Sequence, residues 1–148
     1  MSALTKPSLT LKRRIDAPVE RVWQAWTSGE TLKRWFGPSD TLEVTVADVD
    51  LRIGGHYRIV VRGSDGEKHE VGGIYRAIEP HARLVFTWAW ASTPERESLV
   101  TVALAADGNA TILTLTHEQF ADEPARDRHE KGWTGCLEKL ARHLSQYA

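Results

Sequence analysis

The spacing of apolar positions predicts one long helix near the end of the chain. Between about Pro124 and Tyr147, apolar residues recur three or four positions apart, as they do on one face of an α-helix. A helix of about 24 residues would be about 36 Å long, so we expect it to cross most of the domain. The stripe consists of His129, Trp133, Cys136, Leu137, Leu140, Ala141, Leu144 and Tyr147.

The stripe is uneven in bulk. Its second half is aliphatic, whereas its first half sets Gly132, Gly135 and Cys136 around Trp133. Bulky side chains fill the space between packed elements, and small ones leave room. We therefore expect the second half to close a hydrophobic core and the first half to border a cavity.

The first forty residues predict a strand and two short helices. Alternation over Leu9–Ile15 indicates a half-buried strand. Asp16-Ala17-Pro18 then opens a helix, because proline is favoured in a first helical turn. A second short helix is expected over about Glu30–Phe36, before Gly37-Pro38 ends it.

From Thr41 to Thr116 the apolar period changes to two, which predicts β-strands with one buried face. Turn signals rich in Gly, Pro, Asp and Asn separate the runs. Such short connections indicate antiparallel neighbours. The expected strands are 42–49, 56–62, 69–78, 83–90, 98–105 and 110–117.

This order of elements predicts an α+β fold. A long amphipathic helix must bury its stripe, and an antiparallel sheet offers a matching apolar face. We predict a curved antiparallel sheet wrapped around the C-terminal helix. The 148 residues suit one domain, which we expect to span 1–148 with an ordered core at about 8–147.

Composition narrows the function classes. The formal net charge of −1 gives no footprint for nucleic acid or an anionic membrane. The single cysteine, Cys136, excludes an internal disulfide and a cysteine-rich zinc site. No secretory signal precedes Leu9, and no apolar run reaches membrane-spanning length. We expect a cytoplasmic protein.

A series of short motifs across nearly the whole chain resembles one protein family. They are Asp16-Ala17-Pro18, Val22-Trp23-Gln24-Ala25-Trp26, Leu32-Lys33-Arg34-Trp35-Phe36-Gly37-Pro38, Gly54-Gly55-His56-Tyr57-Arg58, Gly73-Ile74-Tyr75-Arg76-Ala77-Ile78-Glu79-Pro80, Arg83-Leu84-Val85-Phe86-Thr87-Trp88, Leu113-Thr114-Leu115-Thr116-His117-Glu118, and Gly132-Trp133 with Leu137 and Leu140. In this order they resemble the START-like superfamily (SRPBCC or Bet v 1-like), which has the helix-grip fold. Within it, the chain is most similar to the branch named after activators of Hsp90 ATPase.

The resemblance implies a hydrophobic cavity between the sheet and the last helix. It implies ligands such as lipids, polyketides or other apolar small molecules. Some relatives are cyclases or hydrolases, and others only bind. Relatives that activate the chaperone carry a further N-terminal domain, so we expect a co-chaperone role less than ligand binding.

No standard catalytic or metal-binding motif is present in the sequence. His117-Glu118 and His129-Glu130 each lack a second histidine four residues after the first, which a zinc-binding H-E-x-x-H motif requires. We therefore predict no catalytic residues, no metal and no cofactor.

His117 is open to two interpretations. It continues the face of Leu113 and Leu115, so it should point into the interior. Buried polar groups are usually satisfied, and a backbone or hydroxyl partner would make it structural. In a cavity, however, an imidazole could anchor a ligand or act as acid or base.

The aromatic residues allow the same two interpretations, plain core packing or the wall of a ligand pocket. We predict that the protein binds a small apolar ligand between the sheet and the last helix, without a reaction. The alternatives are a chaperone-interaction module and a cyclase or hydrolase that uses His117; a homodimer also remains open. The predicted lining residues are Trp35, Tyr57, Trp88, His117, His129 and Trp133.

Overall fold

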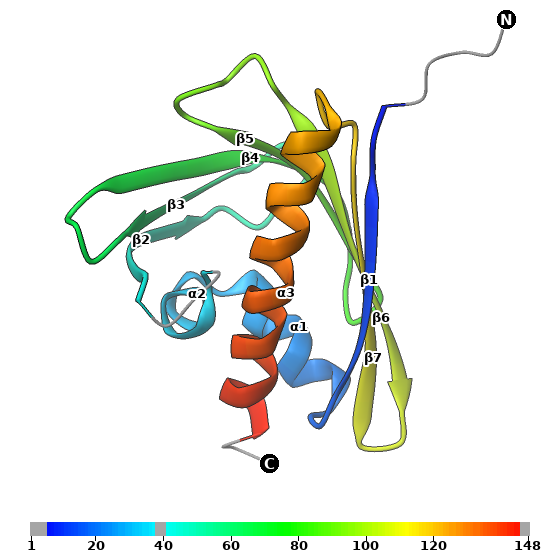
Figure 1. Cartoon of the computed structure of the whole chain (residues 1–148). Coiled ribbons are helices and arrows are strands. Elements are labelled where there is room, and N and C mark those ends of the chain that lie inside the picture. Colours follow the sequence, from blue (N-terminus) through cyan, green and yellow to red (C-terminus); the bar gives the residue numbers. More distant parts are fainter. Residues whose placement is uncertain (1–5, 38–40, 146–148) are drawn as a thin grey trace, which may run out of the picture.

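The computed structural model describes residues 6–37 and 41–145, and within them it confirms the α+β class (Figure 1). The strands form one antiparallel sheet in the order β1-β7-β6-β5-β4-β3-β2. The elements are β1 (Leu9–Ile15), α1 (Val19–Thr27), α2 (Gly29–Trp35), β2 (Glu43–Val49), β3 (His56–Arg62), β4 (Lys68–Glu79), β5 (Arg83–Trp90), β6 (Ser98–Asp107), β7 (Ala110–Glu118) and α3 (Glu123–Ser145).

The element boundaries follow the expected ones closely. β1, β3 and β5 have the predicted bounds, and the other strands differ by one or two residues at their ends. The first helix starts later than expected, because Pro18 is its N-cap and Val19 its first helical residue. The predicted end of the last helix at Tyr147 lies outside the described residues.

α3 crosses the concave side of the curved sheet, while β2, β3 and β4 extend beyond it on one side (Figure 1). The helix begins where the Asp122 carboxylate accepts a hydrogen bond from the Ala125 N–H at 2.8 Å. This satisfies one of the free N–H groups of the first turn. Arg142 and His143 lie in the last turn, where the helix dipole favours positive charge.

The aliphatic half of α3 closes the core. Leu137, Leu140 and Leu144 are buried and belong to the same hydrophobic cluster as residues of β1, β6 and β7. An ion pair of 2.7 Å between Arg13 and Glu138 ties β1 to the helix at its surface. The predicted core-forming role of this half is therefore confirmed.

The ladder between β4 and β5 is interrupted beside the core. No pairing joins Gly73 and Ile74 to the opposing residues of β5; instead, the Ile74 N–H donates to the Thr87 hydroxyl at 2.9 Å. A Cβ atom at Gly73 would meet the Thr87 carbonyl oxygen at 2.0 Å, so only glycine fits this close approach.

α1 and α2 cover one end of the concave face of the sheet (Figure 1). The hydroxyl of Ser28 caps α2 by accepting from the Thr31 N–H at 3.4 Å. Trp35 is buried and donates its indole N–H to the Ala25 carbonyl at 2.9 Å, which joins the two helices. Within the described residues, the helices are too short or too polar to cross a bilayer.

Candidate functional site

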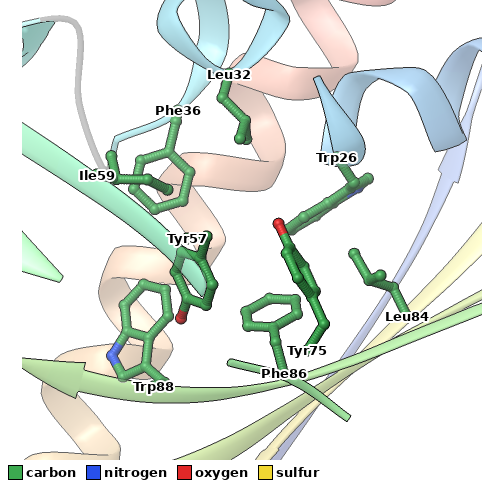
Figure 2. A pocket seen from close by; sticks show the side chains of 9 residues that line it. All are labelled: Trp26, Leu32, Phe36, Tyr57, Ile59, Tyr75, Leu84, Phe86 and Trp88. Carbon is green, nitrogen blue, oxygen red and sulfur yellow. The ribbon is translucent and has the colours of Figure 1, made fainter. Parts of the chain in front are cut away.

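Two spaces lie between the concave face of the sheet and the helices. The inner one is a cavity of about 20 Å³, which is room for about one water molecule. Figure 2 shows the side chains around it pointing toward one another. They are Trp26, Leu32, Phe36, Tyr57, Ile59, Tyr75, Leu84, Phe86 and Trp88.

The polar groups at the inner cavity differ in their partners, and the buried indole N–H of Trp26 has no hydrogen-bond partner in the described part of the chain. The Tyr57 hydroxyl donates to the Thr87 carbonyl at 2.6 Å, at the break in the β4–β5 ladder. Burial raises the pKa of Tyr57 well above its usual value, and it also raises that of Tyr75. Both phenols therefore stay protonated, and the inner cavity is a nearly filled part of the core.

The outer space is a groove of about 810 Å³ beside the first half of α3. Gly132, Trp133 and Cys136 line it, so the thin half of the helical stripe borders a cavity as its bulk predicted. The other lining residues are Phe36, Gly37, Leu42, Thr45, Val46, Arg58, Val60, Val61, Lys68, His69, Glu70, Trp88, Trp90, Ala91, Ser92, Arg128 and His129.

The groove is open rather than enclosed. Strand register puts Val61 and His69 on the concave face, opposite the outward-facing Val60 and Glu70, yet all four line the groove. Its volume therefore describes a depression that continues to the rim of the sheet. Phe36 and Trp88 line both spaces, and together they separate the groove from the inner cavity.

His129 lies in the wall of the groove and accepts two indole hydrogen bonds. Its Nε2 receives the N–H groups of Trp88 at 3.3 Å and Trp90 at 3.0 Å. Its Nδ1 lies 2.7 Å from the Ala125 carbonyl. Because a carbonyl only accepts, the proton of the neutral ring is on Nδ1. Burial lowers the pKa of His129; the Ala125 carbonyl opposes this, and the charge of Arg128 reinforces it.

His117 is fully buried behind that wall. Its Nδ1 accepts the indole N–H of Trp133 at 2.9 Å, and its Nε2 lies 2.7 Å from the Ser98 hydroxyl. Since an indole only donates, Nε2 carries the proton and donates to Ser98. The Ser98 hydroxyl in turn donates a hydrogen bond to the Trp88 carbonyl at 3.2 Å. Burial, with a smaller contribution from His129, lowers the pKa of His117 to about 2.

These tautomers limit the acid–base chemistry available. A general base for Ser98 needs a free lone pair on His117 Nε2, but that atom carries the proton. On both rings the basic nitrogen already accepts from indole donors. The Ser98–His117 pair is thus a structural hydrogen bond, and neither imidazole presents a vacant lone pair to the groove.

The six predicted lining residues fall into three groups. Trp88, His129 and Trp133 line the groove. Tyr57 lines the inner cavity, as does the other side of Trp88. Trp35 and His117 line neither space; both are buried among other side chains.

Residues outside the predicted set also line the groove. Trp90 is half-buried there, and its period-two spacing from Trp88 could have identified it. Arg128 precedes His129 and lies at the groove because Arg128, Gly132 and Cys136 are four residues apart on one flank of α3. Within residues 6–37 and 41–145, no group of three or more His, Cys, Asp or Glu side chains could hold a metal ion.

Solved structures with this architecture are numerous. The AHSA1 protein from Silicibacter pomeroyi is 29% identical with a TM-score of 0.85, over 96% of this chain and 100% of that one. A protein from Chromobacterium violaceum is 26% identical with a TM-score of 0.84, over 93% and 96% of the two chains. A protein from Nitrosomonas europaea is 26% identical with a TM-score of 0.80, over 95% of each.

No curated protein matches the chain significantly. The family model described as Activator of Hsp90 ATPase homolog 1-like protein matches residues 16–145. This stretch runs from the end of β1 to the end of α3, so it includes both spaces and both buried histidines. The chain therefore belongs to the family of Activator of Hsp90 ATPase homolog 1-like proteins, which have a START-type fold.

Proposed function

We propose that this protein binds a small hydrophobic ligand in the groove between α3 and strands β2–β5. The observation that carries the proposal is the groove itself, about 810 Å³ in volume with three tryptophans in its wall. Sites for small molecules typically measure about 300–1,000 Å³ and combine apolar walls with a few polar groups. The inner cavity of about 20 Å³ is too small for this role.

The walls can supply useful affinity. Trp90 is only half-buried, so a ligand that covers it removes aromatic surface from water. Burial of about 200 Å² of apolar surface stabilises a complex by about 5 kcal/mol before the cost of ordering the ligand. Trp88 and Trp133 are held by hydrogen bonds to the two histidines, so little further ordering is needed on binding.

The proton positions favour a binding role over a cyclase or hydrolase reaction. An acid–base step would require His117 or His129 to exchange a proton with the ligand. His117 has no exposed surface, and the Nε2 of His129 is covered by the Trp88 and Trp90 indoles.

Interaction with an Hsp90-type chaperone is the second candidate. The family name favours it, and so does the connection between β2 and β3, where Ile53 is 63% and Leu51 is 40% exposed. Exposed apolar side chains that cluster mark protein-contact surfaces. This candidate predicts stimulation of a purified Hsp90-type ATPase that is lost in Ile53→Ser and retained in a groove variant.

The groove is best tested with Gly132→Leu, which adds a side chain inside it. Replacing a mid-helix glycine favours the helix by up to about 1 kcal/mol, so the variant should fold. Fluorescence titration with the neutral probe N-phenyl-1-naphthylamine should show binding to the wild type and at least about tenfold weaker binding to Gly132→Leu.

Thr134→Leu is the matched control. It adds the same side chain to the same helix at an exposed position that does not line the groove, so binding should be unchanged. Equal loss in both variants, or no binding to the wild type, would contradict the proposal.

A further inference from the structure

The charged side chains of the groove are strongly biased toward one sign. Its lining includes the cations Arg58, Lys68 and Arg128 but only one carboxylate, Glu70. The whole chain, by contrast, carries a formal net charge of −1. The groove is thus more positive than the protein around it.

The one carboxylate is already engaged. Glu70 pairs with Arg58 at 3.1 Å, and Arg58 also lies 3.8 Å from Asp48. These three side chains form an ion-pair cluster with a net charge of −1 on the outer face of the sheet, so Arg58 is not free to bind a ligand. Lys68 and Arg128 have no ion-pair partner among the residues that the structure describes.

The two unpaired cations lie on different sides of the groove: Arg128 is on α3, whereas Lys68 lies opposite Arg62 in the β3–β4 ladder and is on the outer face of the sheet with Glu70. Lys68 begins β4, and the Ala91 N–H donates to the Glu70 carbonyl at 2.8 Å, which joins the start of β4 to the end of β5. That end of β5 faces the first turns of α3, because the Trp90 indole reaches His129. Arg128 is the neighbour of His129 and is close enough to lower its pKa.

The other end of the groove is apolar. It is formed by Phe36 and Leu42, with Cys136 of α3. The Cys136 thiol is 3% exposed, and burial raises its pKa to about 12, so it adds no charge there. The groove therefore has an apolar end, an aromatic middle and a cationic end.

We propose that the ligand is an amphipathic organic anion, with one acidic group such as a carboxylate on an aromatic or aliphatic body. The body would lie between Trp88, Trp90 and Trp133, and the acidic group would lie toward Arg128. A guanidinium can bind a carboxylate through two parallel hydrogen bonds. The inference rests on the proposed function and specifies the ligand of the same groove.

Two probes with the same ring skeleton separate the charge from the apolar body. 8-Anilinonaphthalene-1-sulfonate carries one acidic group, and N-phenyl-1-naphthylamine lacks it. We expect the anionic probe to bind at least fivefold more tightly to the wild type at low salt. Arg128→Gln should weaken the anionic probe about three- to tenfold and leave the neutral probe unchanged. Lys68→Gln should change the anionic probe by less than about twofold, because Lys68 is on the outer face of the sheet.

Lys131→Gln is the matched control. Lys131 is exposed on α3 and does not line the groove, so its loss changes net charge equally without touching the site. Equal affinities for the two probes, or equal weakening by Arg128→Gln and Lys131→Gln, would overturn the anion inference while leaving hydrophobic binding intact. Failure of both probes to bind would overturn the anion inference together with the proposed function.

Discussion

The two halves of α3 face the same sheet, but one packs tightly against it and the other leaves an open groove. Leu137, Leu140 and Leu144 bury themselves completely against the core. One turn earlier, Gly132 and Cys136 leave a groove of about 810 Å³. The difference lies in side-chain volume on a continuous helix, so a single element both closes the core and borders the site.

The two histidines repeat this comparison at the scale of one side chain. Each accepts indole hydrogen bonds and is held neutral by burial. His117 lies behind Trp133 with no exposed surface, whereas His129 lies in the groove wall. Two neutral histidines that both accept indole hydrogen bonds therefore lie in different places, one in the core and one in the wall of the groove.

The largest expected effect is on stability, from truncation of the closed half. Leu140→Ala should lower the free energy of unfolding by about 2–5 kcal/mol, because it opens a cavity at a fully buried position. Urea unfolding monitored by tryptophan fluorescence measures this change, and affinity for the neutral probe should stay within about twofold of the wild type.

Leu42→Ala removes the same atoms from the groove, where Leu42 is only half-buried. Its stability cost should be well below that of Leu140→Ala, and its loss of probe affinity should be larger. Equal losses of unfolding free energy in Leu42→Ala and Leu140→Ala would show that the groove is packed as tightly as the core beneath the aliphatic half of α3.

A smaller expected effect is the dependence of stability on pH that the buried His117 causes. The folded pKa of His117 is about 2, below its ordinary value of 6.5. Above pH 6.5 both the folded and unfolded states hold the ring neutral. As the pH falls below 6.5, the unfolded state gains a proton that the folded state does not take up. Stability should therefore fall by about 1.4 kcal/mol per pH unit, a loss that continues toward pH 2.

His117→Gln provides the comparison, since glutamine does not titrate. The difference in unfolding free energy between wild type and variant should shrink steadily from pH 6.5 to pH 4.5, although the variant is the less stable protein at neutral pH. Its probe affinity should match that of the wild type, because His117 does not line the groove. A pH-independent difference in stability would contradict the burial of a neutral ring.

The last prediction concerns the chemical reactivity of the Cys136 thiol, which lies at the boundary between the two halves of α3. Burial raises the pKa of Cys136 from 9.0 to about 12. At neutral pH the thiolate population is then about a thousandfold lower than in the unfolded chain. Alkylation by iodoacetamide should be slower by at least that factor in the native protein than in urea. Rapid native labelling would contradict the burial of the Cys136 thiol.

Much of the fold was determined by local pattern. Period-two alternation predicted the strands, with β1, β3 and β5 at their observed bounds, and the helical stripe predicted α3. The inward direction of His117 also followed from its register with Leu113 and Leu115. Its two partners did not, because Ser98 and Trp133 reach it from other elements.

The division of aromatic residues between core and groove required tertiary structure. Trp35 and Trp88 were both predicted to line a cavity, yet Trp35 of α2 is buried against Ala25 of α1 while Trp88 lines both spaces. The difference depends on contacts between distant segments, because Trp88 donates to His129 of α3 and Trp35 donates to Ala25 of α1.

The sequence by itself determined the class of fold, the order of its elements and the thin half of the helical stripe. These follow from periodicity and side-chain volume, which are local properties of the chain. Tertiary structure alone decided which rings face the groove, where the histidine protons lie and that Arg128 lies at the groove beside His129. Such features depend on distances between segments far apart in the chain, and only packing sets those distances.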